Sequence, residues 1–190
     1  MTRDGAYQTL TVYTQSQNLI RHHLAVESAM RALAQYLSKT KNQFFDVEEW
    51  GITGLLHDAD YELTRKHPEE HTLYLEEKLG EQIPEKIMYA IKAHNYVYTK
   101  IEPISFMDWS LYCCDELTGF MVACTLVLPD KKLRSLTVEF VLKKLEDPSF
   151  SRSVNREQIK LCEKSLGIKL PEFVQIVLIS MQAIDSKLSL

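Results

Sequence analysis

Apolar residues recur at helical spacing in long segments of this chain, and Pro and Gly residues separate these segments. Leu24, Val26, Met30, Leu33 and Leu37 form one such series. Residues three or four positions apart lie on the same face of an α-helix, so this spacing predicts an amphipathic helix. No segment shows the strict alternation of apolar and polar residues that a half-buried strand requires. We therefore predict an all-α fold.

Capping residues and prolines place the ends of the expected helices. Asp46 and Glu49 form the pattern of a capping box, and Pro68, Pro84 and Pro171 stand where a first helical turn accepts proline. The expected helices span residues 14–37, 46–57, 68–79, 84–94, 103–128, 136–146, 155–166 and 171–187. Residues 14–128 would form the core of a single domain that spans residues 1–190. Residues 129–190 would form a helical extension packed on that core.

The composition excludes several classes of protein. The 190 residues suit one domain, and 45% hydrophobic with 25% charged residues is close to the globular average. The net charge of −4 disfavours nucleic acid as a main partner, because duplex binding depends on neutralising phosphates. No apolar run reaches transmembrane length, and the polar N-terminus lacks the apolar core of a signal peptide. We expect a cytoplasmic monomer or homodimer without a membrane partner, with reduced, mostly buried thiols at Cys113, Cys114, Cys124 and Cys162.

His57 and Asp58 are the sharpest candidates for chemistry. Neighbouring residues on a helix point about 100° apart, so both can reach one metal ion only where the helix ends. The preceding Leu55 and Leu56 direct this helix end inward, where an ionised carboxylate needs compensating partners. A cation is the simplest partner. An exposed histidine and aspartate at a helix end is the alternative that spacing alone leaves open.

Other residues can complete a metal site with this pair. The six histidines all lie in the first half of the chain, and neutral imidazole is the commonest metal ligand near neutral pH. Asp115 lies in an otherwise apolar helical segment, where an unpaired carboxylate would be costly. His23 follows His22 and would point elsewhere, so we expect it at the surface or in a supporting position.

The order of these residues resembles the HD superfamily of phosphohydrolases, closest to the small bacterial HD-domain subgroup with an HDIG signature. The resemblance runs through residues 18–120, and more loosely through 131–156. It rests on the ordered set His22, His57-Asp58, His71, His94 and Asp115. The signature departs from the subgroup, because Ala59-Asp60 stands where Ile-Gly would follow.

The resemblance implies two divalent ions, and a single ion, as in similar proteins that keep only the four ligands of the first site, is the alternative. Carried over residue by residue, it makes His22, His57, Asp58 and Asp115 the ligands of one metal. His71 and His94 would complete a second metal site, with the Asp58 carboxylate as the bridge. Mixed nitrogen and oxygen ligands suit Mn, Fe, Co, Ni or Zn, and Mg is a further candidate.

The resemblance also implies a reaction, which is the hydrolysis of a small phosphorylated metabolite or nucleotide by metal-activated water. Asp58 would be catalytic as the bridging ligand, and Asp60 would orient the water or act as an acid. Arg65, Lys66 and Thr118 would contact the phosphorylated substrate. A solvated basic face is expected at Lys143, Lys144, Arg152 and Arg156, and a role of this extension in covering the substrate is the alternative.

Two other functions fit the same residues. Members of the same superfamily that oxidise a small polyol or phosphonate use a similar six-ligand set on two iron ions. A non-catalytic binding or signalling module that keeps the HD fold is the second alternative.

Overall fold

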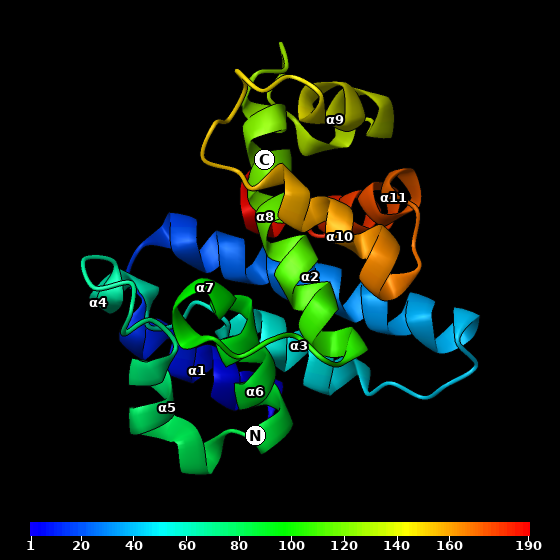
Figure 1. Cartoon of the computed structure of the whole chain (residues 1–190). Coiled ribbons are helices and arrows are strands. Elements are labelled where there is room, and N and C mark those ends of the chain that lie inside the picture. Colours follow the sequence, from blue (N-terminus) through cyan, green and yellow to red (C-terminus); the bar gives the residue numbers. More distant parts are fainter.

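The computed structural model describes residues 1–190 and consists of helices without any β-strand, which confirms the all-α prediction (Figure 1). None of the helices combines the length and the apolar character that crossing a membrane requires. The helical elements are α1 (Arg3–Tyr13), α2 (Gln17–Thr40), α3 (Val47–Leu56), α4 (Tyr61–Thr64), α5 (Leu73–Leu79), η1 (Gly80–Gln82), α6 (Glu85–His94), α7 (Tyr96–Thr99), α8 (Phe106–Leu126), η2 (Leu133–Ser135), α9 (Val138–Leu145), α10 (Arg156–Leu166), α11 (Leu170–Gln182) and α12 (Asp185–Leu188).

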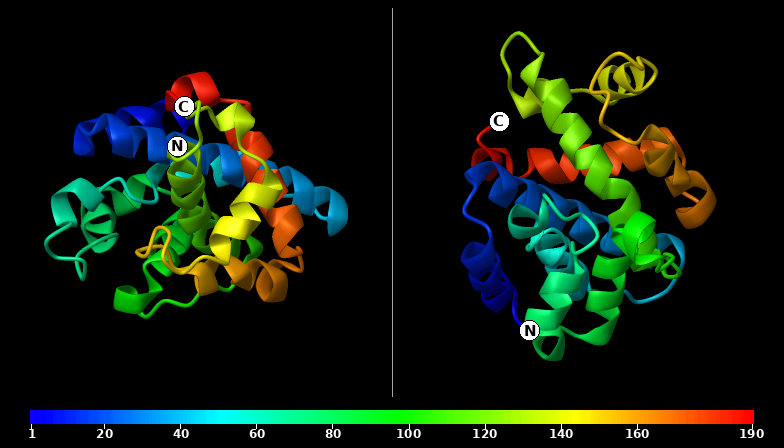
Figure 2. Two further views of the ribbon diagram at one scale, coloured as in Figure 1. Left: turned by 90° about the horizontal axis from the view of Figure 1, so that it is seen from above. Right: turned by 60° about the vertical axis from the view of Figure 1, so that its left-hand side comes forward.

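The two longest helices, α2 and α8, cross at the centre of the molecule. In Figure 1, α1, α3, α5 and α6 lie below α2, whereas α9, α10 and α11 lie above it. The right-hand view of Figure 2 shows the same division, with the yellow and orange helices α9 and α10 far from the blue helix α1. The two central helices therefore belong to both halves of the fold.

The C-terminal helices share the main hydrophobic core. Buried Met30 of α2 and Phe120 of α8 belong to the same apolar cluster as Phe173 and Val177 of α11. A second, smaller cluster joins α1, α3, α5 and α6 through residues such as Leu55. The C-terminal extension thus contributes side chains to the hydrophobic core around α2 and α8 and does not only pack on its surface.

Three helix starts differ from the prediction. Helix α1 was not predicted, because it buries only Ala6 and Leu10 and so shows no apolar periodicity. The helix expected from Pro68 begins only at Leu73, since Thr72 adopts a left-handed conformation with φ 72°. Helix α8 begins at Phe106, where the reciprocal capping box that Ser105 forms ends the preceding loop.

Arg156 does not belong to a solvated basic face. Its half-buried guanidinium donates to main-chain carbonyl oxygens of Leu145, Asp147, Phe150, Ser151 and Val154. The same group lies over the Phe120 ring, 5.5 Å from its centroid. Arg156 therefore organises the segment between α9 and α10, and the expectation of a solvated role at this position was wrong.

Gly54 marks the closest approach of α3 to α2. A Cβ atom at this position would lie 2.8 Å from the carbonyl oxygen of Val26 and 3.0 Å from the Cα of Glu27. Both neighbours are main-chain atoms of α2, so neither can move aside without shifting the helix. The glycine therefore sets the depth at which α3 packs, and with it the position of the residues that follow α3.

We predict that Gly54→Ala lowers the free energy of unfolding by about 2 kcal/mol, because the added methyl group forces the two helices apart. Urea unfolding followed by circular dichroism measures this change. Gly119→Ala is the matched control, since a Cβ there meets no atom within 4 Å. It should stabilise α8 by up to about 1 kcal/mol. Equal stability of the two variants would contradict the close approach.

Candidate metal centre

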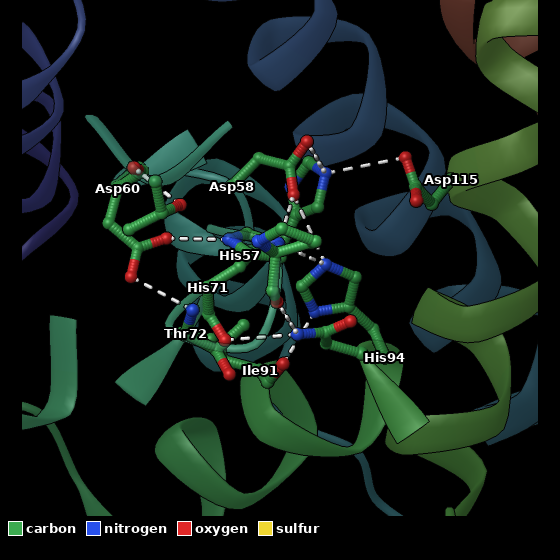
Figure 3. Close-up of polar contacts among 12 residues, drawn as sticks. His57, Asp58, Asp60, His71, Thr72, Ile91, His94 and Asp115 are labelled. Atoms are coloured by element: carbon green, nitrogen blue, oxygen red, sulfur yellow. Dashed lines mark hydrogen bonds and ion pairs between the residues drawn. The ribbon is translucent and has the colours of Figure 1, made fainter. Parts of the chain in front are cut away.

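The structure brings the six expected ligand residues together at one place. His22 comes from α2, His57 and Asp58 from the end of α3, and His94 is the last residue of α6. His71 lies in the turn before α5, and Asp115 lies midway along α8. Figure 3 shows Asp58 at the middle of the group, with Asp115 on one side and Asp60 on the other.

One group of donor atoms lies between α2, α3 and α8. His22 Nε2 is 3.0 Å from Asp115 Oδ1 and 4.0 Å from Asp58 Oδ2. His57 Nε2 is 3.3 Å from the same Asp115 oxygen and 3.7 Å from the same Asp58 oxygen. Ligands that bind one metal ion at about 2.0–2.2 Å stand about 3.0–3.6 Å apart. The spacing of these atoms is close to that of the ligands of a single ion.

A second group uses the other oxygen of Asp58. His71 Nε2 is 3.0 Å and His94 Nε2 is 3.1 Å from Asp58 Oδ1. The two imidazole nitrogens are 3.3 Å from each other. Each oxygen of the Asp58 carboxylate therefore faces a different pair of histidines. His22, His57 and Asp58 can hold one metal ion, and Asp58, His71 and His94 can hold another.

Hydrogen bonds on the outer nitrogens orient three of the histidines. Nδ1 of His57 lies 2.8 Å from the carbonyl oxygen of Gly54, and Nδ1 of His94 contacts the carbonyl oxygen of Ile91 (Figure 3). A carbonyl oxygen only accepts, so both Nδ1 atoms carry a proton and each Nε2 is directed at the site. Nδ1 of His71 similarly donates to Asp60 Oδ1 over 2.7 Å. This is the arrangement that supports metal-binding histidines.

The surroundings of His57 show whether a cation fits between the donor atoms of the first group. Its side chain has no exposed surface, and its Nε2 atom has no hydrogen-bond partner. When this imidazole is neutral, an Nε2 lone pair faces the carboxylates of Asp58 and Asp115. A proton or a metal ion must therefore stand between them, and mixed nitrogen and oxygen donors suit a divalent transition metal.

Without metal, protons provide this positive charge. Burial lowers the pKa of His57, but Asp58 and Asp115 outweigh it and raise that pKa to about 9. Burial also lowers the pKa of His71, but Asp58 and Asp60 outweigh it and raise that pKa to about 10. Burial raises the pKa of Asp58 and Asp115, yet the surrounding histidines hold both well below the usual range. Metal binding must then displace protons from the histidines.

Asp60 lies behind His71. It has no exposed surface, and both of its oxygens are engaged, Oδ1 by His71 and Oδ2 by the main-chain N–H groups of Thr72 at 2.9 Å and Leu75 at 3.0 Å. The expected role of acid or water-orienting group does not fit this placement. The carboxylate instead positions the His71 ring and the left-handed turn at Thr72.

Of the three residues expected to bind substrate, Arg65 and Lys66 do not contact the candidate ligands, and Thr118 contacts only the main chain of Asp115. Arg65 and Lys66 are exposed after α4, and neither makes an ion pair or hydrogen bond with a ligand residue. Thr118 is buried, and its hydroxyl donates to the main-chain carbonyl of Asp115 over 2.9 Å. Thr118 therefore serves its own helix, and the two cations remain in solvent.

Two further residues lie beside the candidate ligands. His23 is completely buried with its ring 5.2 Å from that of His57, which agrees with a supporting position and not with the surface, and burial holds its pKa well below the usual range. Asn95 donates from Nδ2 to the carbonyl oxygens of His71 at 3.0 Å and Pro68 at 3.3 Å. It joins the turn of His71 to the end of α6, and an asparagine beside a histidine gives no sequence signal for that.

Comparison of the chain with protein-family models, with curated proteins and with solved structures gives no match. The resemblance to the HD superfamily therefore stays a prediction from the ordered residues.

We predict that Asp60→Asn weakens metal binding about 10- to 100-fold, because the neutral side chain no longer anchors the His71 imidazole. Competition with a fluorescent chelator measures the affinity for Mn²⁺ and Zn²⁺. Glu70→Gln is the control, since Glu70 is exposed and its side chain makes no hydrogen bond or ion pair. Unchanged affinity in a folded Asp60→Asn protein would contradict the positioning role.

The raised pKa values also predict how stability depends on pH. A histidine whose pKa in the folded state lies above its ordinary value of about 6.5 contributes its full stabilisation below pH 6.5. This contribution is lost as the pH rises through the folded-state pKa. The melting temperature of the metal-free protein should therefore fall between pH 7 and about 10, through His57 and His71. Calorimetry in the presence of EDTA measures this slope, and bound Mn²⁺ should reduce it. A His71→Gln variant that keeps the full slope would contradict the assignment.

Proposed function

We propose that this chain is a metal-dependent phosphohydrolase of the HD type that acts on a small phosphorylated metabolite or nucleotide. The proposal rests on the position of the Asp58 carboxylate between two pairs of histidines. His22 and His57 face its Oδ2 atom. His71 and His94 face its Oδ1 atom. A carboxylate between two histidine pairs suits two ions held side by side. The ordered set of ligand residues along the chain supports the same reaction class.

Two bound divalent cations would lower the pKa of a coordinated water towards ~7 and bind the oxygens of a phosphoryl group. The chain would hold those cations with neutral imidazoles, because the outer nitrogens of His57 and His94 are already committed to carbonyl oxygens. Asp58 and Asp115 offset only part of the charge of two divalent cations. The loaded centre would remain positive, which suits a phosphate group without help from Arg65 or Lys66.

The exposure of the ligands indicates the side from which a substrate approaches. The side chains of His22 and Asp115 are 22% and 20% exposed, whereas those of His94 and His57 are 6% and 0% exposed. The centre is closed at the α3 and α6 side and open between α2 and α8. A phosphate group and its attacking water would both have to enter from this open side.

We predict metal-dependent release of phosphate when the Mn²⁺-, Co²⁺- or Zn²⁺-loaded protein is tested against a panel of nucleotides and sugar phosphates. Asp58→Asn should lower the rate at least about 100-fold, because it weakens both ion sites at once. Glu70→Gln should retain the full rate. Circular dichroism and metal analysis of each variant separate loss of metal from loss of fold.

Two results would replace the proposal. Iron-loaded protein that consumes oxygen with a polyol or phosphonate, shows a mixed-valent EPR signal and releases no phosphate would identify an oxygenase. Protein that binds no metal at any pH, and whose fold is unchanged in Asp58→Ala, would identify a non-catalytic module.

A further inference from the structure

A cavity lies at the other end of the helices that carry the candidate metal ligands. Its volume is about 540 Å³, within the range of small-molecule sites. It is lined by the N-terminal ends of α3, α6 and α8, whereas His57 and His94 stand at the C-terminal ends of α3 and α6. Ten helical residues at 1.5 Å each separate the two sites by about 15 Å. The residues that line it are Gln43, Phe44, Phe45, Asp46, Glu49, Trp50, Glu85, Lys86, Tyr89, Ile104, Ser105, Phe106, Met107 and Asp108.

Aromatic rings form much of the wall of this cavity. The Phe45 ring packs against Trp50 with a centroid distance of 5.3 Å and against Phe106 with a centroid distance of 5.8 Å. Phe44 and Tyr89 add two further rings. The faces of aromatic rings attract cations, and rings that converge are the usual receptor of ammonium groups.

The chain itself shows this attraction at Phe106. The ammonium group of Lys41 lies over that ring, 5.4 Å from its centroid. Lys41 is not among the residues that line the cavity, so the walls that face the cavity are left for a second cation. One ring of the aromatic wall thus already takes part in a cation–π contact.

The charged side chains around the cavity also favour a cation. Four carboxylates and one ammonium group line it, which leaves a net negative charge. The ammonium of Lys86 is paired with Glu49 over 2.7 Å, whereas Glu85 has neither an ion pair nor a side-chain hydrogen bond. An organic cation would therefore find favourable charge as well as apolar surface.

An anion would find few donors there. The amide groups of Glu48 and Glu49 at the start of α3 already donate to Asp46. The amide of Asp108 at the start of α8 donates to the Ser105 hydroxyl. These caps use the N–H groups of α3 and α8 that would otherwise bind a phosphate or carboxylate. The start of α6 has no side-chain cap, but the unpaired carboxylate of Glu85 stands there and repels an anion.

We propose that this cavity binds a small organic cation, an ammonium or quaternary ammonium group carried on an apolar body. The aromatic rings would surround the apolar body and the cation, and Glu85 and Glu49 would supply the opposing charge. The site is independent of the metal centre and of the reaction proposed there. The alternative occupant is an apolar side chain of another protein, since Phe44 and Ile104 are 86% and 73% exposed at this surface.

Titration calorimetry of the full chain with benzyltrimethylammonium tests the proposal. Benzyl alcohol and benzenesulfonate serve as the neutral and anionic comparisons. We expect saturable binding of the cation, at least about tenfold tighter than that of either comparison. Binding that does not saturate, or that is equal for the three compounds, would overturn the proposal and leave a general apolar surface suited to a protein partner.

Variants of opposite charge make the test sharper. Glu85→Gln should weaken cation binding about threefold, and Lys86→Met should strengthen it by a similar factor. Phe44→Leu, at an exposed position that should not disturb folding, should also weaken it. Glu81→Gln, an exposed carboxylate outside the cavity, is the matched control and should change nothing.

The same titration with Asp58→Asn locates the binding. Unchanged affinity places the cation in the aromatic cavity. Affinity lost in Asp58→Asn but kept in Glu85→Gln and Phe44→Leu would show that the probe binds at the metal ligands, and would overturn the proposal. Phosphate release by the wild-type protein tests the proposed function separately, because that assay contains no organic cation.

Discussion

The largely buried carboxylate of Asp58 is the constraint on which the rest of this structure depends. An ionised carboxylate with little exposed surface is costly unless cations or hydrogen-bond donors surround it. Here four imidazoles surround it, two at each oxygen. They come from α2, from α3, from the turn before α5 and from α6, so the fold must bring these four segments to one point. Protons satisfy the carboxylate when metal is absent, and the same geometry suits divalent cations.

Helix packing provides this convergence. Gly54 lets α3 approach the main chain of α2, which places His57 beside His22 and His23. The turn before α5 has no such packing, and it is held instead by Asp60 from one side and Asn95 from the other. The C-terminal helices contribute indirectly, because they complete the core around α2 and α8 and so support the helices of His22 and Asp115.

The two ends of α3 and α6 differ in chemistry. The C-terminal ends, where main-chain carbonyls carry partial negative charge, meet the candidate ligands His57 and His94. Carbonyl oxygens near these ends also accept the outer imidazole protons. The N-terminal end of α3 has its amides capped by Asp46, whereas that of α6 has no side-chain cap, and both ends line the cavity of aromatic rings and carboxylates. One pair of helices thus separates the proposed metal chemistry from the proposed cation site.

The sequence by itself determined the helical class and most helix positions, because apolar periodicity and capping residues act within one segment. It also predicted the six residues that meet at the centre, since an ionisable group in an apolar segment needs a partner, and the order of these residues resembles a known family. Only the tertiary structure decided what surrounds them. Asp60 accepts a hydrogen bond from His71, and Thr118 donates to a carbonyl oxygen of its own helix. Arg65 and Lys66 are exposed to solvent. Arg156 binds carbonyl oxygens of the segment between α9 and α10. The roles of Asp60 and Arg156 depend on main-chain groups of other segments, and those groups have no residue type that a sequence could reveal.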